Sequence, residues 1–357
     1  MTTRDLTARM LDAVQARSGG TALRVACGLL MFAAACGDGP TALGGGAGTI
    51  TFLRSIQQQL STMNGDGSHQ EPLGPSGRAT WDYEWSPDGA WIAVLSGGEH
   101  VNVTQDSGIS IFRAGGVREQ VIGKQFAGTI NWVHWAPNGA DIAFTSGGEV
   151  YRINRGGFGL LQLSFGAISA EDPQWSPNGA QVLFGRTNDT SFVQELWIAA
   201  ANGSGSTQVP VPDNALHARW SPHGDWIAYD NGLGIWLVKP DGTGRHPLST
   251  NCSAGICSDS AEFQYPRWAP DASHIACTAR PNTNLPDLYI YVLSPDSLSS
   301  VAVAPGQNPD WSLDSRLIAY EDATSHISLA AVSGHATRSL TTVVDAPDWD
   351  RWPRWRP

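Results

Sequence analysis

Residues 85–93 read Trp-Ser-Pro-Asp-Gly-Ala-Trp-Ile-Ala, and near-copies of this stretch recur along the chain. Each of the first six copies begins with a Trp, continues into a short turn and has Ile or Val seven residues after the Trp. The repeat is marked by seven tryptophans spaced 40–50 residues apart: Trp85, Trp135, Trp175, Trp220, Trp268, Trp311 and Trp355. One Trp and one turn per unit of this length are typical of a β-propeller.

The residues within one repeat predict its strands. Pro presets φ and Gly accepts positive φ, so Ser86-Pro87-Asp88-Gly89 predicts a tight turn. The run after it, Trp91-Ile92-Ala93-Val94, is apolar throughout, as expected of a strand that is covered on both faces. A third strand and a more polar edge strand follow in each unit. Four antiparallel strands per repeat therefore make one blade.

The seventh blade is divided between the two ends of the chain. Trp355 lies in the last strand-like stretch, while Ile50-Thr51-Phe52 matches a second strand that has no Trp before it. Residues 60–67 then match a third strand with its hairpin, and residues 71–73 match a fourth. The sequence thus predicts an all-β, seven-bladed β-propeller over residues 49–357, in which the C-terminal strand completes the N-terminal blade. Closure of this kind leaves no unpaired inner edge.

The first 36 residues have the pattern of a bacterial secretory signal. Four Arg within residues 1–24 precede an apolar run from Val25 to Ala35. This run is shorter than the roughly 20 residues that span a bilayer. A basic segment, a short apolar run and small residues predict export across the inner membrane.

Cys36 follows the small residues at once and resembles the acylated cysteine of a bacterial lipobox. We therefore expect lipidation of Cys36 and a periplasmic or outer-membrane-anchored lipoprotein. Ordinary cleavage after Ala35, which would give a soluble secreted protein, is the alternative, and Met10 is an alternative start. Residues 37–48 are rich in Gly and predict a flexible linker.

Composition restricts the partners. The formal net charge is −11, and only 15% of the residues are charged. A nucleic-acid-binding surface needs clustered Lys and Arg, so the sequence argues against DNA or RNA as a partner. We expect a monomeric propeller without a cofactor.

The remaining cysteines suggest structural roles. Cys277 stands at an apolar position of a second strand, which predicts a buried thiol. Cys252 and Cys257 share one insertion between blades, and in an oxidising compartment this spacing favours a disulfide. A metal held by the two thiols is the alternative, but no other Cys or His stands at ligand spacing.

The Trp-Ser-Pro-Asp-Gly-x-x-Ile-Ala repeats resemble those of TolB-like propellers, as does the hairpin Met63-Asn64-Gly65-Asp66-Gly67. The resemblance covers residues 50–357 and implies an envelope propeller that binds partners. TolB itself carries an α/β domain before a six-bladed propeller, whereas only a linker precedes the first strand here. Related repeats occur in prolyl-oligopeptidase-type enzymes and in oligogalacturonate lyases.

No sequence motif of a hydrolase nucleophile, a zinc protease or a redox dithiol is present. Superposed repeats instead place one residue before each Trp on the innermost strand, which predicts a ring near the axis: Glu84, His134, Gln174, Arg219, Arg267, Asp310 and Arg354. Two residues before these stand Asp82, Trp132, Asp172, His217, Tyr265, Asn308 and Trp352. Strand alternation would give both sets one direction.

Two interpretations of the ring remain open. Its acidic and basic members either pair between blades and fill the channel wall, or present a face to a ligand. His134 and His217 alone are weak support for a metal site, such as an oligogalacturonate lyase would need. The sequence therefore favours a non-catalytic module that binds an envelope protein or a cell-wall component. The alternative is a carbohydrate-active enzyme that uses the channel mouth.

Overall fold

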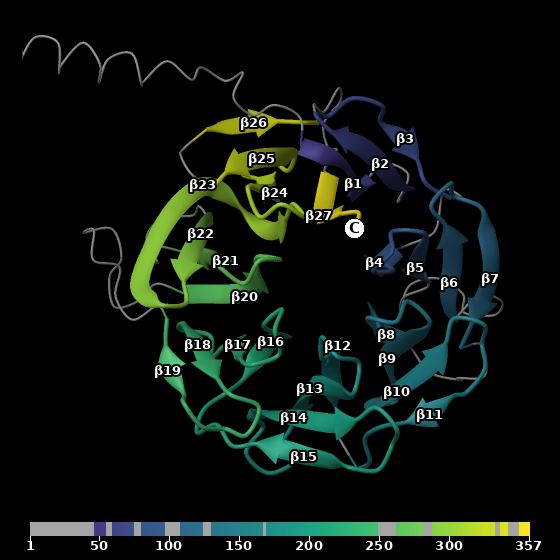
Figure 1. Cartoon of the computed structure of the whole chain (residues 1–357), viewed down its shortest axis with the longest axis vertical. Helices are drawn as coiled ribbons and strands as arrows, with labels where there is room; N and C mark the ends of the chain where they lie inside the picture. The colour runs from purple at the N-terminus through teal and green to yellow at the C-terminus, as the bar shows by residue number, and fades with distance from the viewer. Residues whose placement is uncertain are drawn as a thin grey trace, which may run out of the picture. The chain divides into compact units, whose positions relative to one another are not determined.

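Antiparallel strands arranged around an axis build the unit Gly45–Pro357 in the computed structural model of the chain (Figure 1). The structure describes residues 46–54, 59–74, 80–96, 108–123, 130–166, 169–248, 262–280, 288–332, 336–341 and 350–357. No helix in these ranges is long and apolar enough to cross a membrane. The predicted all-β propeller fold is confirmed. The signal segment with Cys36, and Cys252 with Cys257, lie outside the described residues.

The described strands form five four-stranded sheets and one seven-stranded sheet, all antiparallel between neighbours. The first two sheets contain β27 (Asp350–Trp355), β1 (Gly46–Arg54), β2 (Gln59–Gly65) and β3 (Glu71–Pro72), and then β4 (Thr80–Trp85), β5 (Trp91–Ser96), β6 (Gly108–Arg113) and β7 (Arg118–Ile122). The third and fourth contain β8 (Ile130–Trp135), β9 (Asp141–Ser146), β10 (Glu149–Asn154) and β11 (Leu161–Gln162), and then β12 (Ala170–Trp175), β13 (Gln181–Thr187), β14 (Gln194–Ala200) and β15 (Ser206–Val209). The fifth contains β16 (Leu216–Trp220), β17 (Ile227–Asp230), β18 (Ile235–Val238) and β19 (His246–Pro247).

The seven-stranded sheet differs from the separate blades that the repeats predict. It contains β20 (Glu262–Trp268), β21 (Ile275–Arg280), β22 (Tyr289–Ser294), β23 (Ser297–Trp311), β24 (Leu317–Asp322), β25 (Ile327–Ala331) and β26 (Thr337–Ser339). β23 pairs with β22 as far as Pro305 and with β24 from Gly306 onward. A Cβ at Gly306 would stand 2.4 Å from the carbonyl oxygen of Glu321, so only glycine fits where the strand changes partner. One continuous strand therefore replaces the expected loop between two repeats.

The two ends of the unit meet in one sheet. β1 pairs with β27, with Ile50 opposite Trp355, and the order of this sheet is β27-β1-β2-β3. A Cβ at Gly48 would lie 2.9 Å from the ring of Trp355, so the indole packs directly on the backbone of β1. β1 begins at Gly46, within the range 37–48 that the sequence predicts as a linker.

The turn after each Trp is a hydrogen-bonded unit. In the first, Ser86 N–H donates to the carbonyl of Trp91 (2.8 Å), and Trp91 N–H donates to the Ser86 hydroxyl (2.9 Å). Asp88 accepts from Ala90 N–H at 3.0 Å. Gly89 has φ +62°, a conformation that side chains with a Cβ disfavour. These contacts explain why turns similar to Ser-Pro-Asp-Gly follow the first six repeated tryptophans.

The hydrophobic core lies between neighbouring sheets. One cluster joins Ile109 and Ile111 of β6 to Val133, Trp135 and Phe144 of the next sheet, all buried. Equivalent clusters connect four further pairs of consecutive sheets, and another lies between the two parts of the seven-stranded sheet on either side of Gly306. Cys277 is fully buried with a free thiol in one of them, as predicted. The sheets between two such clusters are therefore covered on both faces, which explains their apolar second strands.

Candidate functional site

The innermost strands are joined by hydrogen bonds from the repeated tryptophans. In four cases the indole Nε1 donates to the main-chain carbonyl of the residue that precedes the Trp of the previous repeat. The pairs are Trp135 with Glu84 (3.0 Å), Trp175 with His134 (3.2 Å), Trp268 with Arg219 (3.3 Å) and Trp311 with Arg267 (2.9 Å). These bonds fix the backbone of four of the seven predicted ring residues.

A bulge three residues before the Trp interrupts most inner strands. Six non-glycine residues there have φ between +48° and +57°: Trp132, Asp172, His217, Tyr265, Asn308 and Trp352. The pairing register shifts at the same place, for example between Glu171 and Gln174. Strict alternation of side chains therefore does not hold in these strands. Each positive φ costs on the order of 1 kcal/mol, so surrounding contacts must maintain it.

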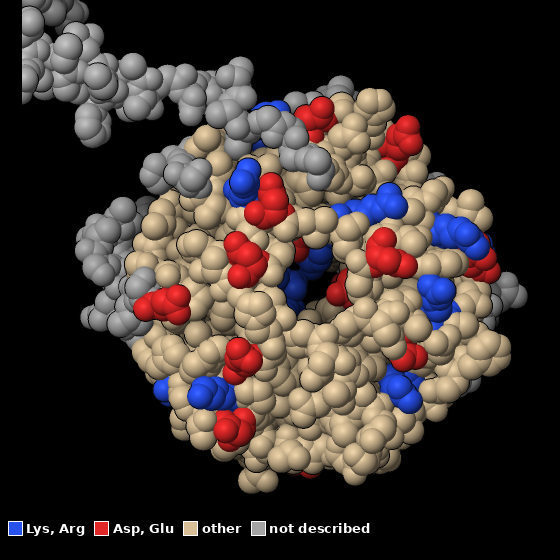
Figure 2. Space-filling model, in the orientation of Figure 1, with Lys and Arg blue, Asp and Glu red and all other residues tan. Residues whose placement is uncertain are grey.

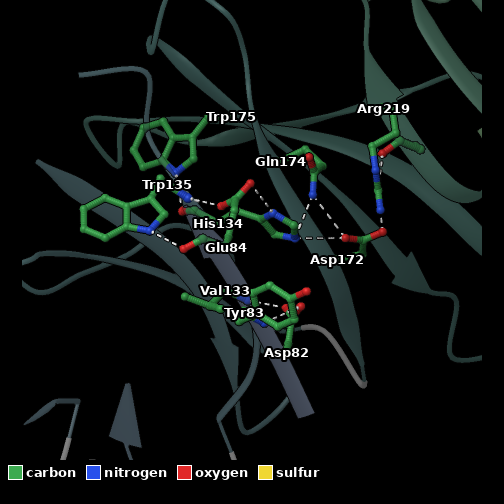
Figure 3. A network of polar contacts seen from close by, with 11 residues as sticks. Asp82, Tyr83, Glu84, Val133, His134, Trp135, Asp172, Gln174, Trp175 and Arg219 are labelled. Atoms are coloured by element: carbon green, nitrogen blue, oxygen red, sulfur yellow. Dashed lines mark hydrogen bonds and ion pairs between the residues drawn. The ribbon is translucent and has the colours of Figure 1, made fainter. Parts of the chain in front are cut away.

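Five side chains of neighbouring inner strands form one hydrogen-bonded network (Figure 3). His134 Nδ1 lies 3.3 Å from Glu84 Oε1, and His134 Nε2 lies 3.1 Å from Asp172 Oδ1. Gln174 donates to Asp172 at 3.2 Å, and Arg219 forms an ion pair with the other Asp172 oxygen. Glu84 also accepts from the backbone N–H of Trp135 at 2.5 Å. Charged partners in adjacent sheets therefore satisfy one another.

The charges in this network depend on each other. Burial opposes protonation of His134, but the carboxylates of Glu84 and Asp172 outweigh it and raise the pKa of His134 to about 9. Burial also disfavours ionisation of Asp172, yet Arg219 and His134 hold its pKa well below its usual range. At neutral pH the network contains a protonated His134 between two carboxylates. We call Glu84, His134, Asp172, Gln174 and Arg219 the connected half of the ring.

The remaining ring residues, Arg267, Asp310 and Arg354, form what we call the open half. Asp310 accepts a hydrogen bond from Trp355 N–H at 2.7 Å, and Arg354 donates to the carbonyl of Pro353 at 3.2 Å. No side chain in the described ranges forms a hydrogen bond or ion pair with the guanidinium of Arg267. Figure 2 shows basic and acidic side chains together inside the opening at the axis.

Burial dominates the electrostatics of the open half. It lowers the pKa of Arg267, and the nearby guanidinium groups of Arg219 and Arg354 lower it further. Burial raises the pKa of Asp310 more than Arg354 and Arg267 lower it. Burial opposes the charge of Arg354, but Asp310 and its neighbours raise the pKa of that group. The open half thus combines two guanidinium groups with the carboxylate of Asp310, and the carboxylates of Asp82 and Glu84 also act on Arg354.

A second pair of polar residues, Asp230 and His217, was not predicted as a unit. The fully buried carboxylate of Asp230 lies 2.7 Å from His217 Nδ1 and accepts from Tyr265 N–H at 3.2 Å. The rings of His217 and Tyr265 are 3.9 Å apart. The sequence feature that could have revealed this pair is the acidic residue at the end of the otherwise apolar strand Ile227–Asp230.

The described residues contain no group of three or more His, Cys, Asp or Glu side chains that could hold a metal ion. The two histidines considered for a metal site have separate partners, since His134 contacts Glu84 and Asp172 while His217 contacts Asp230. The ring residues of the connected half are thus joined directly, and those of the open half are neighbours without direct ion pairs.

No protein-family profile matches the chain, and no curated protein matches its sequence. Solved structures do match. An oligogalacturonate lyase in complex with manganese has 12% identity and a TM-score of 0.58 over 83% of this chain and 84% of that chain. TolB from Acinetobacter baumannii has 13% identity and a TM-score of 0.52 over 88% and 68%. A putative TolB from Agrobacterium tumefaciens has 16% identity and a TM-score of 0.53 over 76% and 96%. The resemblance to TolB-like propellers is therefore confirmed at the level of the fold.

Proposed function

We propose that the chain is a seven-bladed propeller that acts as a non-catalytic interaction module in the bacterial envelope. The count of seven takes the seven-stranded sheet as two blades that share β23, in addition to the five separate sheets. The pairing of β1 with β27 closes the ring in this proposal. The module is monomeric and presents one end of the ring to an envelope protein or a cell-wall component.

Exposed apolar side chains at one end of consecutive sheets carry the proposal. Strand direction alternates within a sheet, so the connections after the second and fourth strands lie at the same end. Phe165, Phe192 and Leu233 are on such connections and are 65%, 78% and 69% exposed. Trp132 and Tyr265, near the start of their inner strands at that end, are also exposed. Exposed apolar side chains such as Val117 and Leu313 also occur at the other end, but only this end adds the aromatic rings of Trp132 and Tyr265 on inner strands. Exposed aromatic residues are typical of protein interaction sites.

The proposed location in the cell envelope rests on the sequence. The signal pattern and Cys36 support an exported lipoprotein that is held at the membrane by its acyl chains. The TolB neighbours share the fold, and they fit this location without deciding it. Cys36→Ala should move the protein from the membrane fraction to the soluble envelope fraction. Unchanged membrane retention of the variant would argue against a lipid anchor.

The interaction role is tested by crosslinking in intact cells. The wild-type protein should be recovered with a defined partner, and the double variant Phe192→Ser, Leu233→Ser should lose it while keeping its melting temperature. Both side chains are mainly exposed, so their removal should leave the core unchanged. A matched variant at the opposite end, Phe158→Ser, should retain the partner. Equal loss with Phe158→Ser would contradict the assignment to this end.

A carbohydrate-active enzyme is the second candidate. The likeness to oligogalacturonate lyases and the orientation of His217 by Asp230 beside Tyr265 favour it. A histidine held by a buried carboxylate is the usual arrangement of a general base. Incubation with oligogalacturonate, followed by ultraviolet detection of an unsaturated product, tests this activity. Product formation that His217→Gln abolishes would favour the enzyme over the module.

A further inference from the structure

Arg267 differs from the other six ring residues. Each of the others forms at least one side-chain hydrogen bond: Glu84, His134, Gln174, Arg219, Asp310 and Arg354. The guanidinium of Arg267 has no such bond to the part of the chain that the structure describes. Its backbone carbonyl is fixed by the indole of Trp311 at 2.9 Å, so the base of the side chain is held in place.

An unpaired guanidinium in this position costs stability. Arg267 is half-buried, and its charge is repelled by Arg219 and Arg354, which together with burial lowers its pKa. Arg219 has Asp172 as a direct partner, but the nearest acidic ring residue in the open half, Asp310, forms no ion pair with Arg267. Partial burial of a charge that has no protein partner costs free energy, although less than full burial does. Its presence is explained if a ligand supplies the missing anion.

We propose that Arg267 binds a carboxylate of a partner protein, held by two parallel N–H···O bonds at the axis of the ring. Guanidinium and carboxylate groups match in this bidentate geometry. Arg354 adds attraction at longer range. The source of the carboxylate, an acidic side chain or chain end of a protein, rests on the interaction function proposed above.

The charges around Arg267 select the type of anion. The carboxylates that act on Arg267 are those of Asp310 and Asp172, and those that act on Arg354 are Asp310, Asp82 and Glu84. A monoanion beside Arg267 would meet less repulsion from these carboxylates than a phosphate dianion would.

The test uses three probes on the full chain: acetyl-Gly-Asp-Gly-amide, its Asn analogue and digalacturonate. Arginine side-chain Nε–H signals are followed by NMR during titration. The Asp peptide should shift one signal saturably, and the Asn peptide should not. Arg267→Gln should remove this signal and weaken binding of the Asp peptide at least about tenfold. The matched variant Arg118→Gln, in the outer strand β7, should keep both the shifted signal and the affinity for the Asp peptide.

Stability provides an independent readout. Arg267→Gln removes a repelled charge, so its melting temperature should equal or exceed that of the wild type. Arg219→Gln breaks the ion pair with Asp172 and should melt at a lower temperature. Equal binding of the Asp and Asn peptides, or full binding by Arg267→Gln, would overturn the proposal. Tighter binding of digalacturonate than of the Asp peptide would overturn the assignment to a protein carboxylate.

The outcome separates this inference from the proposed function. Recovery of the crosslinked partner by Arg267→Gln at the wild-type yield would refute the role of Arg267 and leave the interaction module intact. Failure of the wild type to recover any partner would refute the module, whatever the peptides do.

Discussion

The connected half and the open half of the ring contain the same kinds of residues in different states. Asp172 in the connected half contacts His134, Gln174 and Arg219. Asp310 in the open half contacts a single backbone N–H, that of Trp355. Asp172 is buried and Asp310 half-buried, both next to arginines, yet the first is fully paired within the protein and the second is not.

This difference teaches how to separate structural from binding residues in a propeller channel. Where charges satisfy one another between sheets, substitution should affect folding first. Where a charge has no internal partner, substitution should affect binding first and should spare or improve folding. Residue type alone does not distinguish these cases, because Arg219 and Arg267 occupy equivalent positions in adjacent repeats.

The largest expected effect comes from removing β27, which belongs to the open half. Deletion of residues 350–357 removes the buried Trp355 and the strand that pairs with β1. We expect a loss of more than about 5 kcal/mol in the free energy of unfolding, by the scale of core truncations. Urea unfolding measures it. A truncated protein with an unchanged midpoint would show that β27 matters for the channel only, and closure would be wrong.

A smaller effect separates the two buried carboxylates. Asp172→Asn leaves the guanidinium of Arg219 without its charged partner, and breaking a buried pair costs about 3 kcal/mol. Asp310→Asn, the matched change in the open half, weakens one hydrogen bond and should cost about 1 kcal/mol. Chemical denaturation of both variants gives the comparison. Equal losses would remove the distinction between the halves.

The connected half also predicts a pH dependence. The pKa of His134 is raised from 6.5 to about 9 in the folded protein, so protonated His134 stabilises the fold. This contribution is complete below pH 6.5 and disappears as the pH rises through about 9. We expect a loss of roughly 2–3 kcal/mol over this interval. Urea titrations at several pH values should show the slope in the wild type, and His134→Gln should flatten it. An unchanged slope in that variant would exclude His134 as its source.

The smallest effect concerns the turns. The turns of the connected half have glycine at positive φ, as at Gly89 and Gly224, whereas Ala272 has φ +61° in the turn after β20. Ala272→Gly should stabilise the protein by about 0.5–1 kcal/mol, because glycine relieves the strain. Ala276→Gly, in a regular strand nearby, should destabilise it instead. Calorimetric melting of both variants measures the two effects, which should have opposite sign.

Much of the fold could be predicted because its signals are local. The Trp, the turn and the apolar second strand each depend on residues close in sequence, as in Trp85–Val94. Superposing the repeats also placed Glu84, His134 and Arg219 on the inner strands. β23 could not be predicted as one strand, since Pro305-Gly306 is the usual signature of a turn. Only the pairing of β23 with β22 on one side and with β24 on the other shows that the strand continues through this dipeptide.

The pairing inside the ring could not be predicted from sequence. Asp172 and Tyr265 adopt positive φ although neither is glycine, so nothing local indicates the bulge. The partners of Asp172 lie in the preceding and following repeats, and their choice depends on the angle between sheets. The absence of a described partner for Arg267 is likewise a property of the assembled ring.

The indole hydrogen bonds of the repeated tryptophans affect how the channel can evolve. Each indole donates to a main-chain carbonyl, and a carbonyl accepts this bond whatever side chain its residue carries. The joint between repeats therefore places no constraint on the identity of Glu84, His134, Arg219 or Arg267. Because Arg267 has no side-chain partner among the described residues, a lineage can exchange acid, base and amide at this position while the frame stays the same. New specificities can arise at the axis by single substitutions.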